Sequence, residues 1–227
     1  GASVDWSREA FTMSDDLSMA VKEVFIELYN QGLIYKGERL VNWDTVLETA
    51  LSDLEVSSEE ENGSLWYIDY FTSDNEKLTV ATTRPETLLG DTALAVNPED
   101  ERYKGQIGKM ALLPIVNREI PIIADNYVES EFGTGCVKIT PAHDFNDFEM
   151  GKRHGLEVIN ILNFDGTLND NVPDKYQNLN IEDARKLILE DLNTIGQLNK
   201  TEPYKVQIPR SESCLLYTSP SPRDNLR

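Results

Sequence analysis

The most informative part of this chain reads Gly133-Thr134-Gly135-Cys136-Val137-Lys138-Ile139-Thr140-Pro141-Ala142-His143-Asp144-Phe145-Asn146-Asp147. Its two glycines permit a tight turn. The next residues alternate in polarity, which predicts a strand with Lys138 and Thr140 on one face and Val137 and Ile139 on the other. A proline then ends the strand, and Asp144 suits the N-cap of a helix. The stretch therefore predicts a turn, a strand and a helix start in close succession.

The same stretch gathers side chains that can do chemistry: Lys138, Thr140, His143, Asp144 and Asp147. A carboxylate near a helix start and beside a lysine stays ionised, and can bind an ammonium or orient a water. A purely structural explanation is as good, because two acids three residues apart stabilise a helix N-terminus by roughly 1 kcal/mol. A metal site built from the histidine and the two aspartates is a third, weaker hypothesis. The spacing alone leaves these explanations open.

A second motif, from Thr82 to Thr87, follows a predicted strand. Its proline favours a helix or turn start, and Thr83 and Glu86 have the spacing of a capping box. In the structural interpretation it is a strand-to-helix corner with Arg84 in solvent. In the functional interpretation, free backbone amides, hydroxyls such as that of Thr87 and the guanidinium hold a sugar-phosphate terminus.

Composition limits the class of protein. The chain has 227 residues, 40% of them hydrophobic, with a formal net charge of −19. This acidity opposes a broad nucleic-acid-binding face, so any nucleic acid must be held locally. The two cysteines imply no disulfide framework and fit a cytoplasmic protein. No apolar run is long enough to cross a membrane, and no signal peptide opens the chain.

The pattern along the chain predicts a mixed α+β fold. Helices are predicted from Ser14 to Gly32, from Asp144 to His154, and from Asn180 to Ile195. Short strands separated by turns dominate from Leu65 onward, which favours a closed or curled sheet. The run Glu59–Glu61 is interpreted as a solvated loop, and Val158–Leu162 as a further apolar run.

With these motifs in view, the chain resembles the valyl-tRNA synthetases, which are class I aminoacyl-tRNA synthetases. The matching stretches of sequence are Asn42–Asp44, Ala81–Thr87, Gly90–Thr92, Ala95–Pro98, Gly133–Asp147 and Gly151–His154. The resemblance implies a partial, Rossmann-type segment of the catalytic domain over residues 1–55 and a β-barrel-like editing domain with short peripheral helices over 56–205. A return linker then covers 206–213. Residues 214–227 resemble a translated cloning segment and are expected to be non-native.

The resemblance also implies a function: hydrolysis of mischarged threonyl-tRNA(Val). Asp147 would hold the substrate ammonium, with Asp144 and Lys138 as further catalytic residues. The substrate-binding residues would be Thr83, Arg84, Glu86, Thr87, Phe132, Thr140 and His143, with Phe132 as a wall for the terminal adenosine. The partners implied are the tRNA(Val) 3′ end and its threonyl-adenosine moiety, and the chain is expected to be monomeric.

No cofactor or metal is expected for editing. ATP and Mg belong to the intact synthetase, since the family's ATP-site signatures are absent from this chain. Isoleucyl and leucyl relatives share the domain but usually carry Trp where this chain has Glu86, so an isoleucyl-type editing domain is an alternative. A non-catalytic module for aminoacyl-adenosine or the tRNA end is another, and a metal-dependent hydrolase centred on His143 is a third.

Overall fold

The computed structural model describes residues 3, 5–131, 133–211 and 219–225, the last of these as backbone only. The described chain divides into two compact units, residues 1–39 with 224–227, and residues 40–223. No helix in the described residues has both the length and the apolar character that a membrane span requires.

The first unit contains the predicted N-terminal helix. A short 3-10 helix, η1 (Trp6–Arg8), precedes α1 (Asp15–Asn30), whose N-cap is Ser14 and whose first turn holds two aspartates. The chain leaves the helix through Gly32 at a φ of 72°, as predicted. No residue of α1 is buried. Its predicted apolar stripe is therefore exposed, and Phe25, for example, is 51% exposed.

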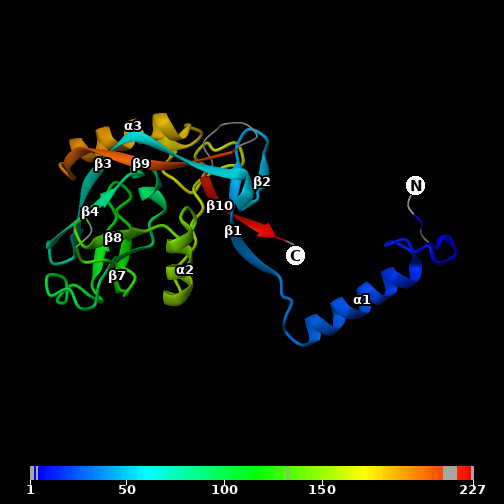
Figure 1. Ribbon diagram of the computed structural model, residues 1–227. Coiled ribbons are helices and arrows are strands. Elements are labelled where there is room, and N and C mark those ends of the chain that lie inside the picture. Colours follow the sequence, from blue (N-terminus) through cyan, green and yellow to red (C-terminus); the bar gives the residue numbers. More distant parts are fainter. Residues whose placement is uncertain (1–2, 4, 132, 212–218, 226–227) are drawn as a thin grey trace. The chain divides into compact units, whose positions relative to one another are not determined.

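The second unit is built on a seven-stranded mixed sheet (Figure 1). The strand order is β4-β3-β6-β7-β5-β8, and β9 pairs with β3. Only β5 and β7 run parallel, while the other ladders are antiparallel. The strands are β3 (Val56–Thr72), β4 (Lys77–Thr82), β5 (Ala93–Val96), β6 (Met110–Leu112), β7 (Glu119–Ala124), β8 (Cys136–Ile139) and β9 (Leu198–Ser211).

The mixed α+β class is confirmed, but a closed barrel is not found. The edge strands β4 and β8 approach each other, yet no ladder joins them among the described residues. The sheet is therefore curled and open. Closing the barrel would require backbone pairing between β4 and the second edge of β8, whose first edge pairs with β5.

Two helices accompany this sheet. The helix α2 (Phe145–His154) begins after the N-cap Asp144 and ends at the left-handed Gly155. The helix α3 (Ile181–Thr194) begins after Asn180 and buries Ala184, Ile188 and Leu192. Both match the predicted ranges, and Ile195, the C-cap of α3, is 52% exposed.

The strand β8 lies between two hydrophobic clusters, which confirms its predicted alternation. Cys136 belongs to the larger cluster, while Ile139, with Val137 packed beside it, belongs to the smaller one. Lys138 and Thr140 therefore lie on the Cys136 face of the strand, at its end next to α2.

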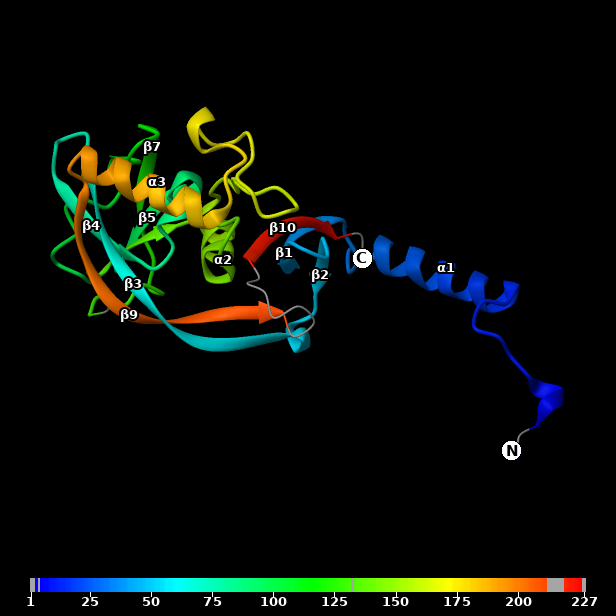
Figure 2. The same ribbon diagram turned by 90° about the horizontal axis from the view of Figure 1, so that it is seen from above.

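One local prediction is wrong. The run Glu59–Glu61 is not a loop but part of β3, which forms a long ribbon with β9 (Figure 2). Cross-strand ion pairs with Lys205 and Arg210 compensate its charge, so an acidic run can form an exposed ribbon. In the apolar run Val158–Leu162, Ile161 and Leu162 are buried, and Leu162 makes one isolated bridge, to Leu168.

A smaller sheet completes the described chain. It has the order β10-β1-β2, with β1 (Gly37–Asp44), β2 (Thr49–Leu51) and β10 (Ser219–Asn225). Trp43 of β1 donates a hydrogen bond from Nε1 to the Phe164 carbonyl (2.8 Å), and the two rings lie 5.4 Å apart. The 3-10 helices η2 (Asp53–Glu55), η3 (Pro85–Gly90) and η4 (Asp174–Tyr176) lie in the connections.

Candidate functional site

The two predicted motifs meet at Lys138. Its ammonium donates to the Thr87 hydroxyl of η3 at 2.8 Å and to the Thr140 hydroxyl at 2.6 Å. It also donates to Asp91 Oδ1 at 3.0 Å. A lysine ammonium has three donors, so all three are used. The structure thus brings Lys138, Thr140 and Thr87 together, but Lys138 has no donor left for a substrate.

Asp91 is the residue that the sequence reasoning missed. It follows η3 and is fully buried. Its Oδ1 accepts from the Thr140 hydroxyl at 2.5 Å as well as from Lys138, and its Oδ2 accepts from the Tyr70 hydroxyl at 2.7 Å. Burial raises the pKa of Asp91, while Lys138 and the two hydroxyls oppose that shift. Arg118 further fixes this segment by donating to the Asp91 backbone carbonyl at 2.7 Å.

Asp147 lies beside this cluster and is half-buried. Its Oδ2 accepts a hydrogen bond from the Thr140 backbone N–H at 2.8 Å. Its Oδ1 accepts no hydrogen bond from any residue that the structure describes. Burial and the nearby Asp144 carboxylate raise the pKa of Asp147 to about 7, although Lys138 and the Thr140 N–H lower it. One carboxylate oxygen therefore stays available for a cationic group.

Asp144 has a different position. It is exposed, and its Oδ1 accepts from the backbone N–H groups of Asn146 (2.8 Å) and Asp147 (3.1 Å). This is an N-cap arrangement. The structural explanation therefore accounts for Asp144, but not for Asp147, whose side chain faces the end of β8 rather than its own helix.

His143 is buried beneath the site and connects three segments. Its Nε2 accepts from the Ile161 backbone N–H at 3.1 Å, which fixes the imidazole tautomer with that nitrogen unprotonated. Its backbone carbonyl accepts from Arg84 Nη1 at 2.7 Å. Among the described residues, no three His, Cys, Asp or Glu side chains gather as metal ligands, and His143, Asp144 and Asp147 each face a separate partner.

The second motif forms a buried ion-pair network instead of a capping box. Glu86 is 2% exposed and accepts a bidentate pair from Arg185 of α3, at 2.9 and 3.0 Å. Arg84 Nε lies 3.6 Å from the same carboxylate. The N-cap of η3 is Arg84, with no side-chain capping bond. Arg84 is therefore held between Glu86 and the His143 carbonyl, and is not the solvated residue of the structural interpretation.

The remaining predicted residues are less defined. Thr83 is half-buried at the corner between β4 and η3. Phe132 lies outside the described residues. Cys136, the thiol nearest to the cluster in sequence, is buried, and burial raises its pKa to about 12. Its thiol is therefore no nucleophile at neutral pH.

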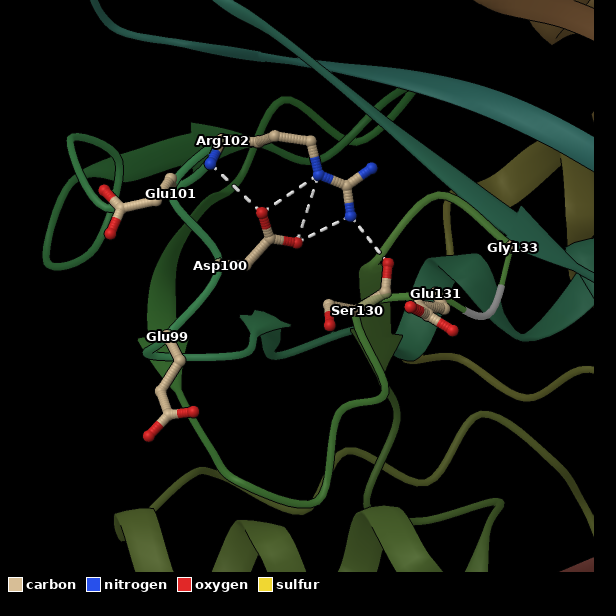
Figure 3. A pocket seen from close by; sticks show the side chains of 7 residues that line it. All are labelled: Glu99, Asp100, Glu101, Arg102, Ser130, Glu131 and Gly133. Atoms are coloured by element: carbon tan, nitrogen blue, oxygen red, sulfur yellow. Dashed lines mark hydrogen bonds and ion pairs between the residues drawn. The ribbon is translucent and has the colours of Figure 1, made fainter.

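A shallow hollow of about 550 Å³ lies elsewhere, lined by Glu99, Asp100, Glu101, Arg102, Ser130, Glu131 and Gly133 (Figure 3). Arg102 bridges it by donating to Asp100 Oδ2 and to the Ser130 carbonyl, both at 2.6 Å. None of the predicted site residues that the structure describes lines it. Arg102, the only cation among its described lining residues, is already paired with Asp100, and the Lys138–Asp147 region, where the predicted residues meet, is the better candidate on chemical grounds.

Comparison with known proteins identifies the family of the chain. A family model described as tRNA synthetases class I (I, L, M and V) matches residues 1–214. This chain belongs to that family. The resemblance to valyl-tRNA synthetases is confirmed by the valine--tRNA ligase of Francisella tularensis, 60% identical over 213 residues. That of Legionella pneumophila strain Lens is 60% identical over 221 residues.

These matches cover 93% and 97% of this chain but only 23% and 24% of the relatives. The chain thus spans about a quarter of their length. Among solved structures, a ternary complex of the Agrobacterium radiobacter K84 agnB2 LeuRS with tRNA and LeuAMS matches with a TM-score of 0.47. The identity is 20%, and the match covers 95% of this chain and 34% of that one.

Proposed function

We propose that residues 56–205 form the editing domain of a valine--tRNA ligase and hydrolyse the ester of mischarged threonyl-tRNA(Val). Residues 1–55 belong, in this proposal, to the catalytic domain, and 206–213 return the chain to it. The start at residue 56 is supported by the ladder of β3 and β9, in which Val56, the first residue of β3, lies opposite Ser211, the last residue of β9; the described part of the return segment continues β9. Valine activation with ATP and Mg is assigned to the whole, cytoplasmic enzyme.

The observation that carries the proposal is the open oxygen of Asp147. Its carboxylate is half-buried, anchored on one side by the Thr140 N–H and free of described partners on the other. A substrate α-ammonium binding there gains a charge-assisted hydrogen bond in a partly desolvated site. Hydroxyls of Thr140 and Thr87 stand nearby. This arrangement suits an aminoacyl group with a polar side chain.

Selectivity provides the reason for such a site. An apolar pocket that binds valine discriminates against threonine, an isostere with an added hydroxyl, by only about a hundredfold in valyl-tRNA synthetases. A second, polar pocket that hydrogen-bonds the hydroxyl supplies the remaining discrimination. In this proposal Arg84 and Thr83 lie toward the tRNA 3′ end, and Asp144 contributes to recognition of the threonine hydroxyl.

The reaction needs no covalent intermediate. Cys136 is buried with a raised pKa, and Lys138 is fully engaged. Water attacks the ester carbonyl while the ammonium is held at Asp147, so that positioning and electrostatics supply the acceleration.

The test is a deacylation assay with threonyl-, valyl- and isoleucyl-tRNA(Val). We expect preferential release of threonine, abolished in Asp147→Ala, with Asp170→Asn as an exposed control. Unchanged turnover in Asp147→Ala would exclude the role given to that residue. Binding of a non-hydrolysable threonyl-adenosine analogue without any deacylation would instead establish the alternative, a non-catalytic binding module.

A further inference from the structure

A buried charge pair underlies the site. Asp91 is 0% exposed, and the Lys138 side chain, 3.0 Å away, is 10% exposed. The two come from distant parts of the chain, the end of η3 and the strand β8. Burying an ion pair is costly unless hydrogen bonds satisfy its remaining polar atoms, and here they do.

The hydrogen bonds have fixed directions. The Thr140 hydroxyl accepts from Lys138, so its own proton goes to Asp91 Oδ1. The Thr87 hydroxyl likewise accepts from Lys138 and donates to the Arg84 carbonyl at 3.0 Å. Tyr70 donates to Asp91 Oδ2. The Asp91 carboxylate therefore only accepts hydrogen bonds, and the Lys138 ammonium only donates them, as expected for an ionised acid and a charged amine.

The charges have a consequence for the neighbouring acid. Lys138 contributes one positive charge and Asp91 one negative charge, and they cancel. The charged groups that face Asp147 are Lys138 from β8, Asp91 from the end of η3 and Asp144 from the start of α2. Because Lys138 is paired with Asp91, it does not neutralise the ionised form of Asp147, which can then bind a cationic ligand.

We propose that Asp91, held by Tyr70, is a positioning residue that binds the Lys138 ammonium and the Thr140 hydroxyl, so that Lys138 does not pair with Asp147. This inference rests on the proposed function for its substrate, an ester that carries an α-ammonium. Lys138 then acts as the internal counter-ion of Asp91. The ammonium-binding charge of the site is Asp147 alone.

The test follows the Asp147 carboxylate by ¹³C NMR over pH 4–9, with the signal assigned through Asp147→Asn. In Asp91→Asn the Lys138 ammonium loses its anionic partner and turns to Asp147. An opposite charge at short range lowers a carboxyl pKa by about 1–3 units, so the titration midpoint should fall by at least about one unit. Affinity for a non-hydrolysable threonyl-adenosine analogue, measured by calorimetry, should fall about tenfold.

The double variant Asp91→Asn/Lys138→Met gives the decisive comparison. It removes both charges, so the midpoint should return toward that of the wild type, and part of the lost affinity should return with it. Stability alone does not separate this role from a purely structural one, because removing both partners of a buried ion pair also removes the uncompensated charge that a single substitution leaves; the Asp147 midpoint and the analogue affinity are therefore the readouts. Asp100→Asn, which removes a buried acid from the Arg102 ion pair elsewhere in the same unit, should leave the midpoint unchanged.

An unchanged midpoint in Asp91→Asn, or a larger displacement in the double variant, overturns the inference. If Asp91→Asn does not fold, the double variant alone decides: the charges of Asp91 and Lys138 cancel, so removing both should leave the Asp147 midpoint near that of the wild type, and a rise of about one unit or more refutes the inference. The titration needs no substrate. A wild-type chain that neither binds the analogue nor hydrolyses the ester would refute the proposed function, while the NMR result would still judge the role of Asp91.

Discussion

Replacing Asp147 by Asn should stabilise the protein at neutral and alkaline pH. The pKa of this carboxyl rises from 3.8 to about 7 on folding. Between those values the unfolded state has released a proton that the folded state retains, so wild-type stability falls as pH rises through this window. Asparagine carries no charge in either state and can still accept the Thr140 N–H. The variant therefore lacks the free-energy cost of ionising residue 147 in the folded state.

The size of the effect follows from the shift. A rise in pKa of about 3 units, at about 1.4 kcal/mol per unit, limits the gain in the free energy of unfolding to about 4 kcal/mol above pH 7. Asp147 is only half-buried, so solvent screening reduces this, and we expect about 2 kcal/mol at pH 8. Near pH 4 the folded state is protonated and the unfolded state is only about half ionised, so the difference should fall below about 1 kcal/mol.

Urea unfolding followed by circular dichroism, at intervals from pH 4 to 8, measures this difference. The exposed Asp170→Asn is the matched control and should follow the wild type throughout. An Asp147→Asn variant that is less stable than the wild type at pH 8, or that differs from it by the same amount at every pH, would refute the reasoning. The same variant should lose deacylation, because the charge that is costly in folding is the one the substrate needs.

Three further predictions concern the surroundings of the site. Arg185→Met leaves the buried Glu86 carboxylate without its bidentate partner and should cost about 3–5 kcal/mol in urea unfolding; a cost below 1 kcal/mol would contradict it. Gly135→Ala should cost about 3 kcal/mol, because its φ is 76° and a Cβ would lie 2.9 Å from a backbone oxygen. Gly196→Ala, with a φ of 71° but open space around it, should cost only about 1 kcal/mol in the same assay. Asp144→Ser keeps an N-cap and removes a charge, so helix stability should change little while the neighbouring carboxyl titrates at lower pH by NMR; an unmoved titration would argue against that coupling.

Local features of the fold could be predicted from the sequence because their causes are local. The N-cap Asp144 and the left-handed Gly155 define both ends of α2 within its own residues. The alternation of β8 is likewise readable from polarity. The ribbon through Glu59–Glu61 was not predictable in this way, since the charges that compensate it lie on β9, far along the chain. The openness of the sheet depends equally on pairing between distant strands.

The site shows the same division more sharply. The three-residue spacing of Asp144 and Asp147 is compatible with a helix cap and with a binding site equally. The structure distinguishes the two acids by the backbone N–H that each accepts from: for Asp144 it belongs to its own helix, and for Asp147 to the end of β8. Asp91 lies in the family-like stretch Gly90–Thr92, but nothing local indicated its role, because its partners Tyr70 and Lys138 lie on different strands. An acid with both oxygens bonded inside the protein, as in Asp91, can position its neighbours but has no oxygen left for a ligand. The acid that keeps an open oxygen at a raised pKa is the one that a ligand can still stabilise, and this distinction selects Asp147 from the three.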